Sequence, residues 1–597
     1  MIKLLISLTL LAFVAITSAK SVPTNGINLK NVEVLDNDGK YILGWEVVGD
    51  EIIFEIEAAT LGWVGFGISP TGGMTGADII IGGVMPDGVP YFEDRFGVGQ
   101  TVPKVDDHND WTLLVAMEFA LSGKTVLRFS RALNTCDDED YPIGNDTSRL
   151  IWSMGETDVI QYHNTQRGTK STNLLHADVP EVDLDKVTTW PMILDMEMPD
   201  QDTSYWCSFH RGPTLETKNH IVGFDAKLPS SESLRHTHHF ILYNCFIPPG
   251  SNETMDEVFD DHTVDKGVTG GHCYDEMSPL PIGYCKEYVF VWSKGGKQMV
   301  FPENVGYPIG NEPGKLYYML EIHYDNPDKL TGVQFESGVE FYYTNELREH
   351  DAGLVTLGHD VEISLTVPPN TPDFLVVGHC APGCTEKFPA DGLTVFNSLL
   401  HSHLSGRKIK TRHFRGNVEL PWIDFDDHYD FDYQQNKPLM EYVKVLPGDQ
   451  VTVECIYDST WKNGEIVLGG LSTREEMCEA ILWYYPKIDI DICGSEYDID
   501  MHIKEFGVTE YHSEMTNTLN KYFIDAPPSL EGDFYNSISF KFNWTEEFKS
   551  GYADRRQNGM HVGDCHVRKD GESWYFDVAY PENYEKYVPE DKCANTN

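Results

Sequence analysis

Short runs of alternating apolar and polar residues recur along this chain. They occupy 41–45, 51–57, 126–130, 319–324 and 451–455, and Gly, Asp and Asn interrupt the stretches between them. An alternation with a period of two places one face of an extended chain in a core and the other in solvent. Long helical stripes are scarce. The sequence therefore predicts an all-β protein built from antiparallel β-sandwiches.

The length and the first residues bear on organisation and compartment. The chain has 597 residues, which is too many for one typical domain, so several folding units are expected. Residues 1–19 have the pattern of a secretory signal peptide, with Lys3 as the positive residue, an apolar run over 4–16, and small residues for cleavage at 17–19. No later stretch has the length and apolar character of a spanning helix. We expect a secreted or lumenal protein with no transmembrane anchor.

Cysteines and glycosylation sequons agree with that compartment. The chain has 12 cysteines, and an even number in an oxidising compartment predicts six disulfides. A four-cysteine zinc site is disfavoured, because only Cys380 and Cys384 approach the close pairing that such a site needs. N-glycosylation sequons begin at Asn145, Asn252 and Asn543.

The acidic composition excludes some partners. The formal net charge is −49, whereas nucleic acids and anionic membranes are bound by clustered Lys and Arg, so no nucleic-acid partner is expected. Solubility is the simpler explanation of the charge, although an acidic surface could also concentrate cationic amines. The acidic run 424–432 could bind calcium, but it lacks the glycine and the spacing of an EF-hand loop. A solvated strand or loop is favoured there.

Five histidines lie in three short segments, at His238 and His239, at His323, and at His401 and His403. On a strand, His401 and His403 would lie on the same face, as two imidazoles that share one ion must. Adjacent His238 and His239 would point to opposite faces of a regular strand, so sharing an ion requires a bulge, a bend or a strand end. For any one of these residues, a hydrogen-bonded polar residue of the core is the alternative.

Met477 adds a possible thioether ligand, since it follows two glutamates and precedes a cysteine. A core methionine is the alternative. A thioether favours Cu(I), and imidazole binds copper in both oxidation states. Together, the motifs resemble the copper type II, ascorbate-dependent monooxygenases, most closely their dopamine β-hydroxylase-like MOX group. The motifs that carry the resemblance are 203–207, 238–240, 321–327, 401–406 and 469–478.

The N-terminal part resembles a DOMON domain, a β-sandwich, at 62–69 and 77–79. Some relatives of that domain bind haem through Met and His, so Met74 with His163 or His176 is conceivable, but packing is favoured for a lone Met beside a turn. Pro, Asp and Thr without periodicity indicate a linker before the copper region. The implied order is a signal peptide at 1–19, a DOMON domain at 20–167, a linker at 168–202, an N-terminal copper domain at 203–360, a C-terminal copper domain at 361–500 and a C-terminal extension at 501–597.

The resemblance implies two copper ions per chain, with ascorbate as electron donor and O2 as co-substrate in the hydroxylation of an aliphatic carbon. The electron-transfer copper would be held by His238, His239 and His323. The oxygen-binding copper would be held by His401, His403 and Met477. In the family the two sites lie in neighbouring β-sandwich halves that face a solvent-filled cleft, so we expect the halves to meet near residue 360.

Further roles follow from the same resemblance. Tyr205 matches a proposed catalytic tyrosine, and a buried structural tyrosine is the alternative. His220 and His236 lie near the first site in sequence and are left unassigned. The implied disulfides are Cys207 with Cys273, Cys245 with Cys285, Cys380 with Cys493, Cys455 with Cys478, Cys136 with Cys593, and Cys384 with Cys565.

Three positions bear on the substrate. Where the peptide-amidating branch holds a substrate carboxylate with arginine, asparagine and tyrosine, this chain has Leu399, Glu479 and Ile481. A glutamate repels a carboxylate, so glycine-extended peptides are not expected as substrates. Glu479 could instead pair with the amine of a phenylethylamine-like molecule that has a benzylic carbon, or it could point to solvent. The rival function is a catalytically silent secreted protein that binds copper or another ligand.

Overall fold

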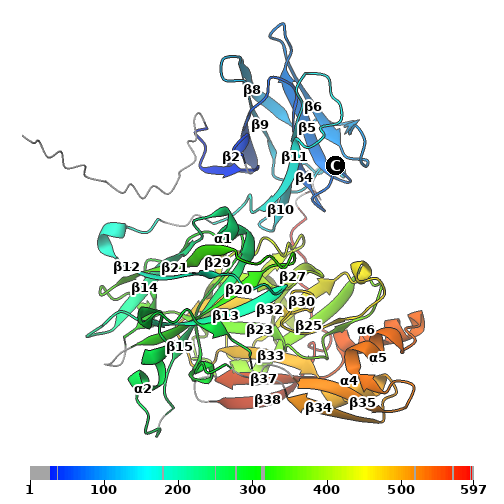
Figure 1. The fold of residues 1–597 in the computed structure, drawn as a ribbon. Helices are drawn as coiled ribbons and strands as arrows, with labels where there is room; N and C mark the ends of the chain where they lie inside the picture. The colour runs from blue at the N-terminus through cyan, green and yellow to red at the C-terminus, as the bar shows by residue number, and fades with distance from the viewer. Residues whose placement is uncertain are drawn as a thin grey trace, which may run out of the picture.

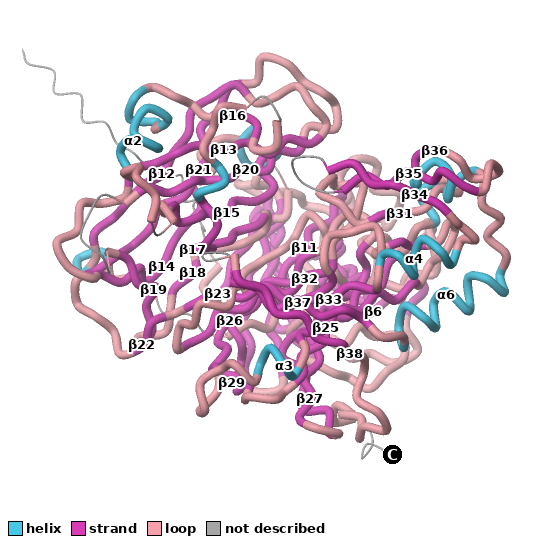
Figure 2. Tube along the Cα trace, turned by 90° about the horizontal axis from the view of Figure 1, so that it is seen from below, coloured by secondary structure: helices cyan, strands magenta, loops and turns pink. Residues whose placement is uncertain are grey.

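A computed structural model describes residues 27–36, 38–177, 181–248, 250–275, 278–310, 316–515, 520–567, 571–591 and 593. The expected signal peptide, 1–19, lies outside the described residues. Strands make up 48% of the structure and helices 10%, which confirms the all-β fold class (Figure 2). None of the helices in the described part of the chain has the length and apolar character needed to cross a membrane.

The N-terminal domain is a sandwich of two antiparallel sheets. Their strand orders are β1-β2-β3-β9-β8 and β11-β10-β4-β5-β6-β7. Large side chains, among them Trp45, Phe54 and Trp111, fill the space between the sheets and are almost fully buried. The strands are β1 (Asn31–Val34), β2 (Tyr41–Val48), β3 (Glu51–Ala58), β4 (Val64–Ser69), β5 (Asp78–Val84), β6 (Pro90–Phe96), β7 (Lys104–Val105), β8 (Thr112–Phe119), β9 (Lys124–Ala132), β10 (Ser148–Met154) and β11 (Arg167–Thr172).

The second sandwich has sheets ordered β12-β21-β14-β19-β22, with β18 beside β14, and β16-β13-β20-β15-β17. Its strands are β12 (Thr188–Glu197), β13 (Thr203–Arg211), β14 (Asn219–Lys227), β15 (Thr237–Cys245), β16 (Gly271–His272), β17 (Cys285–Ser293), β18 (Met299–Val300), β19 (Val305–Ile309), β20 (Tyr317–Asp325), β21 (Gln334–Thr344) and β22 (His350–Asp351), and its helices are α1 (Ser231–His236) and α2 (Met255–Phe259).

Strand β12 lies in the segment where the sequence indicated a linker. It pairs with β21 over its whole length and alternates buried and accessible side chains, with Trp190, Met192 and Leu194 in the core. Pro191 lies within it, and a proline is tolerated because β12 is an edge strand that has only one neighbour. The edge position explains why the proline did not prevent a strand here.

The third sandwich packs a seven-stranded sheet, β29-β26-β32-β23-β33-β37-β38, against a four-stranded sheet, β25-β30-β27-β28. Two of its strands, β37 and β38, come from the C-terminal extension, and β33 joins β37 to the rest (Figure 1). The strands are β23 (Gly353–His359), β24 (Thr366–Val367), β25 (Phe374–Cys380), β26 (Leu393–His401), β27 (Gly406–Arg415), β28 (Val418–Asp426), β29 (Lys437–Val445), β30 (Gln450–Tyr457), β31 (Val467–Leu468), β32 (Cys478–Tyr485), β33 (Ile492–Tyr497), β37 (His561–Val567) and β38 (Glu572–Val578).

The remainder of the extension forms a small helical and β layer. It comprises α4 (Ile499–Glu505), β34 (Glu510–Met515), β35 (Asn520–Ala526), β36 (Gly532–Asp533), α5 (Phe534–Phe540) and α6 (Glu546–Asn558), and a short helix α3 (Pro382–Thr385) lies in the third sandwich. Side chains of α5 and α6, including Phe534 and Tyr552, join the core of the third sandwich.

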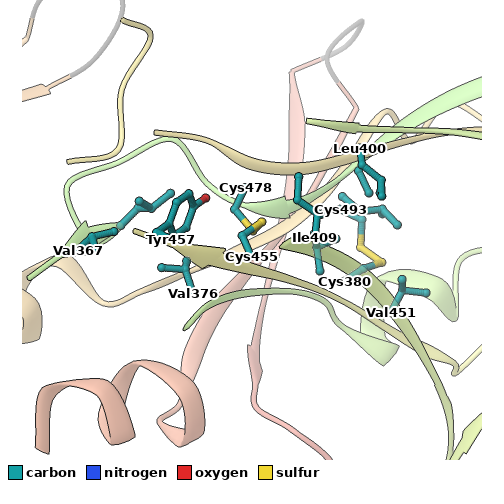
Figure 3. Close-up of a cluster of buried hydrophobic side chains, with 14 of the residues drawn as sticks. Val367, Val376, Cys380, Leu400, Ile409, Val451, Cys455, Tyr457, Cys478 and Cys493 are labelled. Carbon is teal, nitrogen blue, oxygen red and sulfur yellow. A yellow bond between two sulfur atoms is a disulfide. The ribbon is translucent and has the colours of Figure 1, made fainter. Parts of the chain in front are cut away.

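All six implied disulfides are present, so the pairing is confirmed. Three of them lie within the core of the third sandwich: Cys384–Cys565, and the two drawn in Figure 3, Cys455–Cys478 and Cys380–Cys493. The Cys136–Cys593 bridge connects the N-terminal sandwich to the end of the chain across 457 residues. The bridge therefore ties the N-terminal sandwich to the C-terminal extension.

The acidic run 424–432 is a strand end and a loop, as favoured, but it is only partly exposed to solvent. Asp424 is 4% exposed and Tyr429 is 2% exposed. The run ends β28 and enters the connection to β29, where Thr147 of the N-terminal sandwich donates a hydrogen bond to Asp426 at 2.5 Å. Contacts with the N-terminal sandwich thus hold Asp426 and, through the Ser171 hydroxyl, Asp430, whereas the side chain of Asp432 is exposed.

Candidate metal centre

The structure brings His238, His239 and His323 together on two paired strands. His239 of β15 lies opposite His323 of β20, and the pairing register shifts between Thr237 and His239. This irregularity is the bulge that two adjacent histidines need in order to point to one place. The Nδ1 atom of His239 lies 3.3 Å from Nδ1 of His238 and 3.3 Å from Nδ1 of His323.

Burial keeps these three imidazoles neutral. His238 is 1% exposed and His323 is 0% exposed. Burial, together with the nearby imidazole of His401, lowers the pKa of His238 to about 3, and burial with the neighbouring histidines holds the pKa values of His239 and His323 well below their usual range. A neutral imidazole has the lone pair that a metal ligand requires.

His401 and His403 lie at a strand end. The expectation that alternation along one strand would align them was wrong, because β26 ends at His401 and His403 lies beyond it. Their rings are nevertheless 5.2 Å apart between centroids and nearly perpendicular, at 87°. Both are buried, and burial is the main cause of the lowered pKa of each.

A buried carboxylate shapes the turn that carries His403. Glu476, which is 0% exposed, accepts hydrogen bonds from the backbone N–H groups of His403 at 2.8 Å and Ser405 at 2.5 Å. It also accepts one from the hydroxyl of Ser402 at 2.8 Å. Burial raises the pKa of Glu476 to about 7, against the opposing effect of these hydrogen bonds. Without regular strand pairing, this carboxylate determines the path of the chain.

Met477 follows Glu476 and immediately precedes β32. The disulfide between Cys478 and Cys455 anchors the next residue, and the Tyr457 hydroxyl donates a hydrogen bond to the carbonyl of Met477 at 2.6 Å. A methionine side chain is flexible, so these two attachments fix the backbone from which the thioether extends.

Candidate ligands from both groups line one cavity of about 280 Å³. His239 lines it from the second sandwich, and His401 and Met477 line it from the third. The rings of His239 and His401 are 5.9 Å apart between centroids. The two groups therefore adjoin, and the cavity that they line lies between the two sandwich halves, where the family resemblance implies a cleft.

Polar contacts between the sandwiches explain this closeness. The Tyr205 hydroxyl donates a hydrogen bond to the carbonyl of Leu471 at 2.6 Å, and the hydroxyls of Thr203 and Thr473 lie 3.3 Å apart. The Tyr205 ring stacks on His323, with centroids 4.6 Å apart. Burial, with the nearby charges of Glu321 and Glu475, holds the pKa of Tyr205 well above its usual range. Tyr205 is therefore a protonated donor between the two halves.

Models of known families match most of this chain. The N-terminal domain of the copper type II ascorbate-dependent monooxygenases matches residues 192–331, their C-terminal domain matches 350–506, and the DOMON domain matches 37–155. The human DBH-like monooxygenase protein 1 is 36% identical over 524 residues, which cover 86% of this chain and 82% of that protein. The chain belongs to the copper type II ascorbate-dependent monooxygenase family.

Two further relatives are similar over comparable lengths. MOXD1 homolog 1 of Drosophila melanogaster is 32% identical and covers 83% of this chain, with 72% of its own length matched. Dopamine beta-hydroxylase of Rattus norvegicus is 30% identical and covers 85% of this chain, with 85% of its own length matched.

In this monooxygenase-family chain, the residues compared with the peptide-amidating branch lie at the cavity. Leu399, Glu479 and Ile481 all line it, and Leu399 pairs with Ile481 across β26 and β32. Glu321, two residues before His323 on β20, lines it from the other side and accepts a hydrogen bond from the Tyr274 hydroxyl at 2.9 Å. Glu479 is half-buried and lies two residues before Ile481 on β32, and both residues line the cavity.

The other histidines singled out in the sequence have different partners. His220 pairs with Asp351 at 2.8 Å, and His236 contacts the carbonyl of Asp325 through Nδ1 at 2.8 Å. In the N-terminal domain, His176 contacts Asn31 through Nε2 at 3.2 Å and the Ala177 carbonyl through Nδ1 at 3.1 Å. Each of these side chains is engaged in protein contacts.

The remaining candidates for haem lie at the surface of the N-terminal domain. Met74 is in the turn between β4 and β5, and Nδ1 of His163 lies 3.4 Å from the carbonyl of Asn164, the next residue.

Sequence reasoning missed three residues that act on the site. Glu476 was noted only as an acid beside Met477, and Glu321 only as part of a motif. Gln434, whose Oε1 lies 2.8 Å from Nδ1 of His401, was not singled out at all. It is 33 residues from His401, and no local pattern marks such a pair.

Proposed function

We propose that this chain hydroxylates an aliphatic carbon with O2 and ascorbate-type electrons, using one copper ion at each of two sites. His238, His239 and His323 would hold the electron-transfer copper. His401 and His403, with Met477, would hold the oxygen-binding copper. The observation that supports the proposal is that His238, His239 and His323 form one cluster, and that His239, His401 and Met477 line one cavity between the two sandwiches.

The donor atoms fit copper. Two nitrogens about 2.0–2.1 Å from one tetrahedral ion would lie roughly 3.3 Å apart, which is the spacing of the Nδ1 atoms in the three-histidine cluster. Among the described residues, none is a hydrogen-bond partner of the buried Nε2 of His403, whereas its Nδ1 contacts the Glu475 carbonyl at 3.1 Å. Copper would supply one-electron redox chemistry and the binding of oxygen. The protein would supply neutral imidazoles, and those of His238, His401 and His403 are held by a contact of the other ring nitrogen.

The cavity supports a cationic substrate. Two carboxylate residues, Glu321 and Glu479, line it together with four tyrosines, and within the described part of the chain neither lysine nor arginine does. An ammonium group is attracted to such a lining, whereas a carboxylate is repelled. We therefore propose a phenylethylamine-like substrate with a hydroxylatable benzylic carbon, and we exclude glycine-extended peptides.

The test measures ascorbate-driven oxygen uptake and hydroxylated product with aromatic amines, neutral aromatic analogues and glycine-extended peptides. Turnover with amines supports the proposal, and Glu479→Gln should raise KM for amines more than for neutral analogues. Glu441→Gln, on the exposed face of β29, is the matched control. Preference for peptides would overturn the substrate assignment. Copper uptake without product from any of these classes would favour the silent binding protein.

We also propose that the protein is secreted or resides in the lumen of the secretory pathway. The six disulfides support this location, because disulfides persist in oxidising compartments. Asn252 and Asn543 are exposed, whereas Asn145 is only partly exposed at the contact between domains. Glycopeptide mapping of the protein from a secreting cell should find glycans at Asn252 and Asn543, and a protein retained in the cytosol with free thiols would contradict the location.

A further inference from the structure

One segment contacts histidines of both sites. The connection between β28 and β29, with the last residue of β28, comprises residues 426–436 and is called here the bridging segment. Its Phe431 carbonyl lies 3.2 Å from Nε2 of His238, and the Phe431 ring stacks on the same imidazole with centroids 4.1 Å apart. Gln434 of the same segment contacts His401. The segment thus reaches one ligand candidate from each site.

Gln434 completes a continuous chain of hydrogen bonds between the two histidines. Its Nε2 donates to the Phe431 carbonyl at 2.9 Å, and its Oε1 accepts from Nδ1 of His401 at 2.8 Å. Nε2 of His238 donates to the same Phe431 carbonyl. The path from His238 to His401 therefore passes through one carbonyl and one side-chain amide.

This arrangement determines which ring nitrogens carry protons. The Phe431 carbonyl can only accept, so it orients the Gln434 amide with its NH2 group toward Phe431 and its oxygen toward His401. That oxygen can only accept, so Nδ1 of His401 is the protonated nitrogen and Nε2 retains its lone pair. By the same reasoning Nε2 of His238 is protonated and its Nδ1 is available.

The opposite side of the bridging segment is held by the N-terminal domain. The Tyr141 hydroxyl lies 2.7 Å from Nδ1 of His428, and Arg149 donates to the carbonyl of Tyr429 at 2.7 Å. Ser171 donates to Asp430 at 2.5 Å. These contacts come from three different parts of the N-terminal sandwich.

The segment is also fixed within the copper halves. Tyr429 accepts a hydrogen bond from the backbone N–H of Ser402 at 2.9 Å, and the backbone N–H of Gln434 donates to the carbonyl of Lys294 at 2.7 Å. Gln434 is 2% exposed and Phe431 is 8% exposed. A segment that buries Tyr429, Phe431 and Gln434 and has partners in all three sandwiches cannot shift at one of them without strain at the others.

We propose that Gln434 is a positioning residue for both candidate copper sites, and that the bridging segment couples docking of the N-terminal domain to the orientation of His238 and His401. The proposal rests on the proposed function, because it requires that these histidines bind copper. Partners of this kind typically change metal affinity 10–100-fold when they are removed.

The first test compares Gln434→Leu with Gln434→Glu in the full-length protein. Copper affinity is measured by competition with a chelator, and the electron paramagnetic resonance spectrum of Cu(II) reports its coordination. Gln434→Leu should lower the affinity about 10–100-fold and alter the spectrum. Gln434→Glu should largely restore both, because a protonated glutamate donates to Phe431 and accepts from His401. Wild-type affinity and spectrum in Gln434→Leu would overturn the positioning role.

The second test disturbs only the N-terminal side. Tyr141→Phe with Arg149→Met removes two contacts to the bridging segment and alters no ligand candidate. Hydrogen exchange over 426–436 should accelerate in the copper-free protein, and copper affinity should fall about fivefold or more. The matched control is Tyr162→Phe with Arg167→Met, a pair in the same domain in which Arg167 lies over the ring of Tyr162. Equal exchange and affinity in both double variants would overturn the coupling.

The wild-type protein separates this inference from the proposed function. If it binds about two copper ions and the variants behave like it, only the inference fails. If the wild-type protein binds no copper, the proposed function fails and the inference fails with it.

Discussion

The two ligand groups are built in different ways. His239 and His323 lie on neighbouring strands inside a sheet, so backbone hydrogen bonds on both sides of β15 fix their positions. His403 and Met477 lie outside regular strands, and their positions depend on Glu476, a disulfide and contacts of single side chains. A group embedded in a sheet shares the stability of the sheet, whereas a group in turns can be disturbed by the loss of one partner.

The largest expected effect comes from removing a ligand from either group. His401→Ala and His323→Ala should each lower copper content from about two ions to about one per chain and reduce product formation more than about 100-fold. The copper remaining in His401→Ala should keep the spectrum of the three-histidine site. Copper analysis, spectroscopy and coupled oxygen uptake measure these outcomes.

Met477→Leu removes the sulfur but keeps the volume of the side chain, so it separates the loss of a ligand from a loss of packing. It should abolish hydroxylation with little change in unfolding temperature. Full turnover in Met477→Leu or in His401→Ala would contradict the assignment of the oxygen site.

Removal of single disulfides should affect copper binding by the two groups differently. Replacing Cys455 and Cys478 by serine opens a link across 23 residues, and replacing Cys245 and Cys285 opens one across 40 residues. Each change should lower the free energy of unfolding by about 3 kcal/mol. Loss of the Cys455–Cys478 bridge should weaken copper binding by His401, His403 and Met477. Loss of the Cys245–Cys285 bridge should leave copper binding by the three-histidine cluster unchanged, because β15 remains paired on both sides. Chemical unfolding and chelator competition give the two quantities.

An equal loss of copper from both groups in either variant would contradict this difference. It would show that the sheet and the turns respond to the same loss of stability.

Local periodicity was enough to predict the β fold, but only part of the site. The alternation around His323 identifies its strand, and the adjacency of His238 and His239 shows that an irregularity is required there. The family resemblance, and not periodicity, supplied the disulfide pairing. Strand β12 was missed because Pro191 and the surrounding polar residues resemble a linker, although an edge strand accommodates them.

Contacts between distant segments could not be predicted in this way. Glu476 acts through backbone N–H groups about 70 residues away in the chain, as the 73-residue separation from His403 shows. The acidic run 424–432 suggests solvation by its composition, yet three domains meet around the residues that follow Asp424. Composition describes the side chains themselves, whereas burial depends on what the rest of the chain places against them.

The pH dependence of stability tests the contact between Asp426 and Thr147 of the N-terminal sandwich. Burial raises the pKa of Asp426 from 3.8 to about 6, despite the hydrogen bond from Thr147. Between about pH 4 and pH 6 the folded protein therefore binds more protons than the unfolded chain, and its stability should fall as pH rises. In Asp426→Asn, the decrease in the free energy of unfolding between about pH 4 and pH 6 should be smaller by roughly 1–2 kcal/mol. Denaturant unfolding at several pH values measures it, with Asp427→Asn as the control, and an unchanged slope in Asp426→Asn would contradict the assignment.

The smallest expected effect concerns the hydrogen bond of Tyr205 that connects the second and third sandwiches. Tyr205→Phe removes the hydrogen bond to the Leu471 carbonyl but keeps the ring stacked on His323, so stability should fall by about 1 kcal/mol. If the hydroxyl only holds the halves together, kcat should fall less than about tenfold and both copper spectra should be preserved. A residue that transfers a proton in the reaction contributes about 100-fold or more. A loss of that size, with unchanged KM and unchanged spectra, would make Tyr205 a catalytic residue. It would also show that the group of His401, His403 and Met477 depends on the second sandwich for chemistry as well as for position.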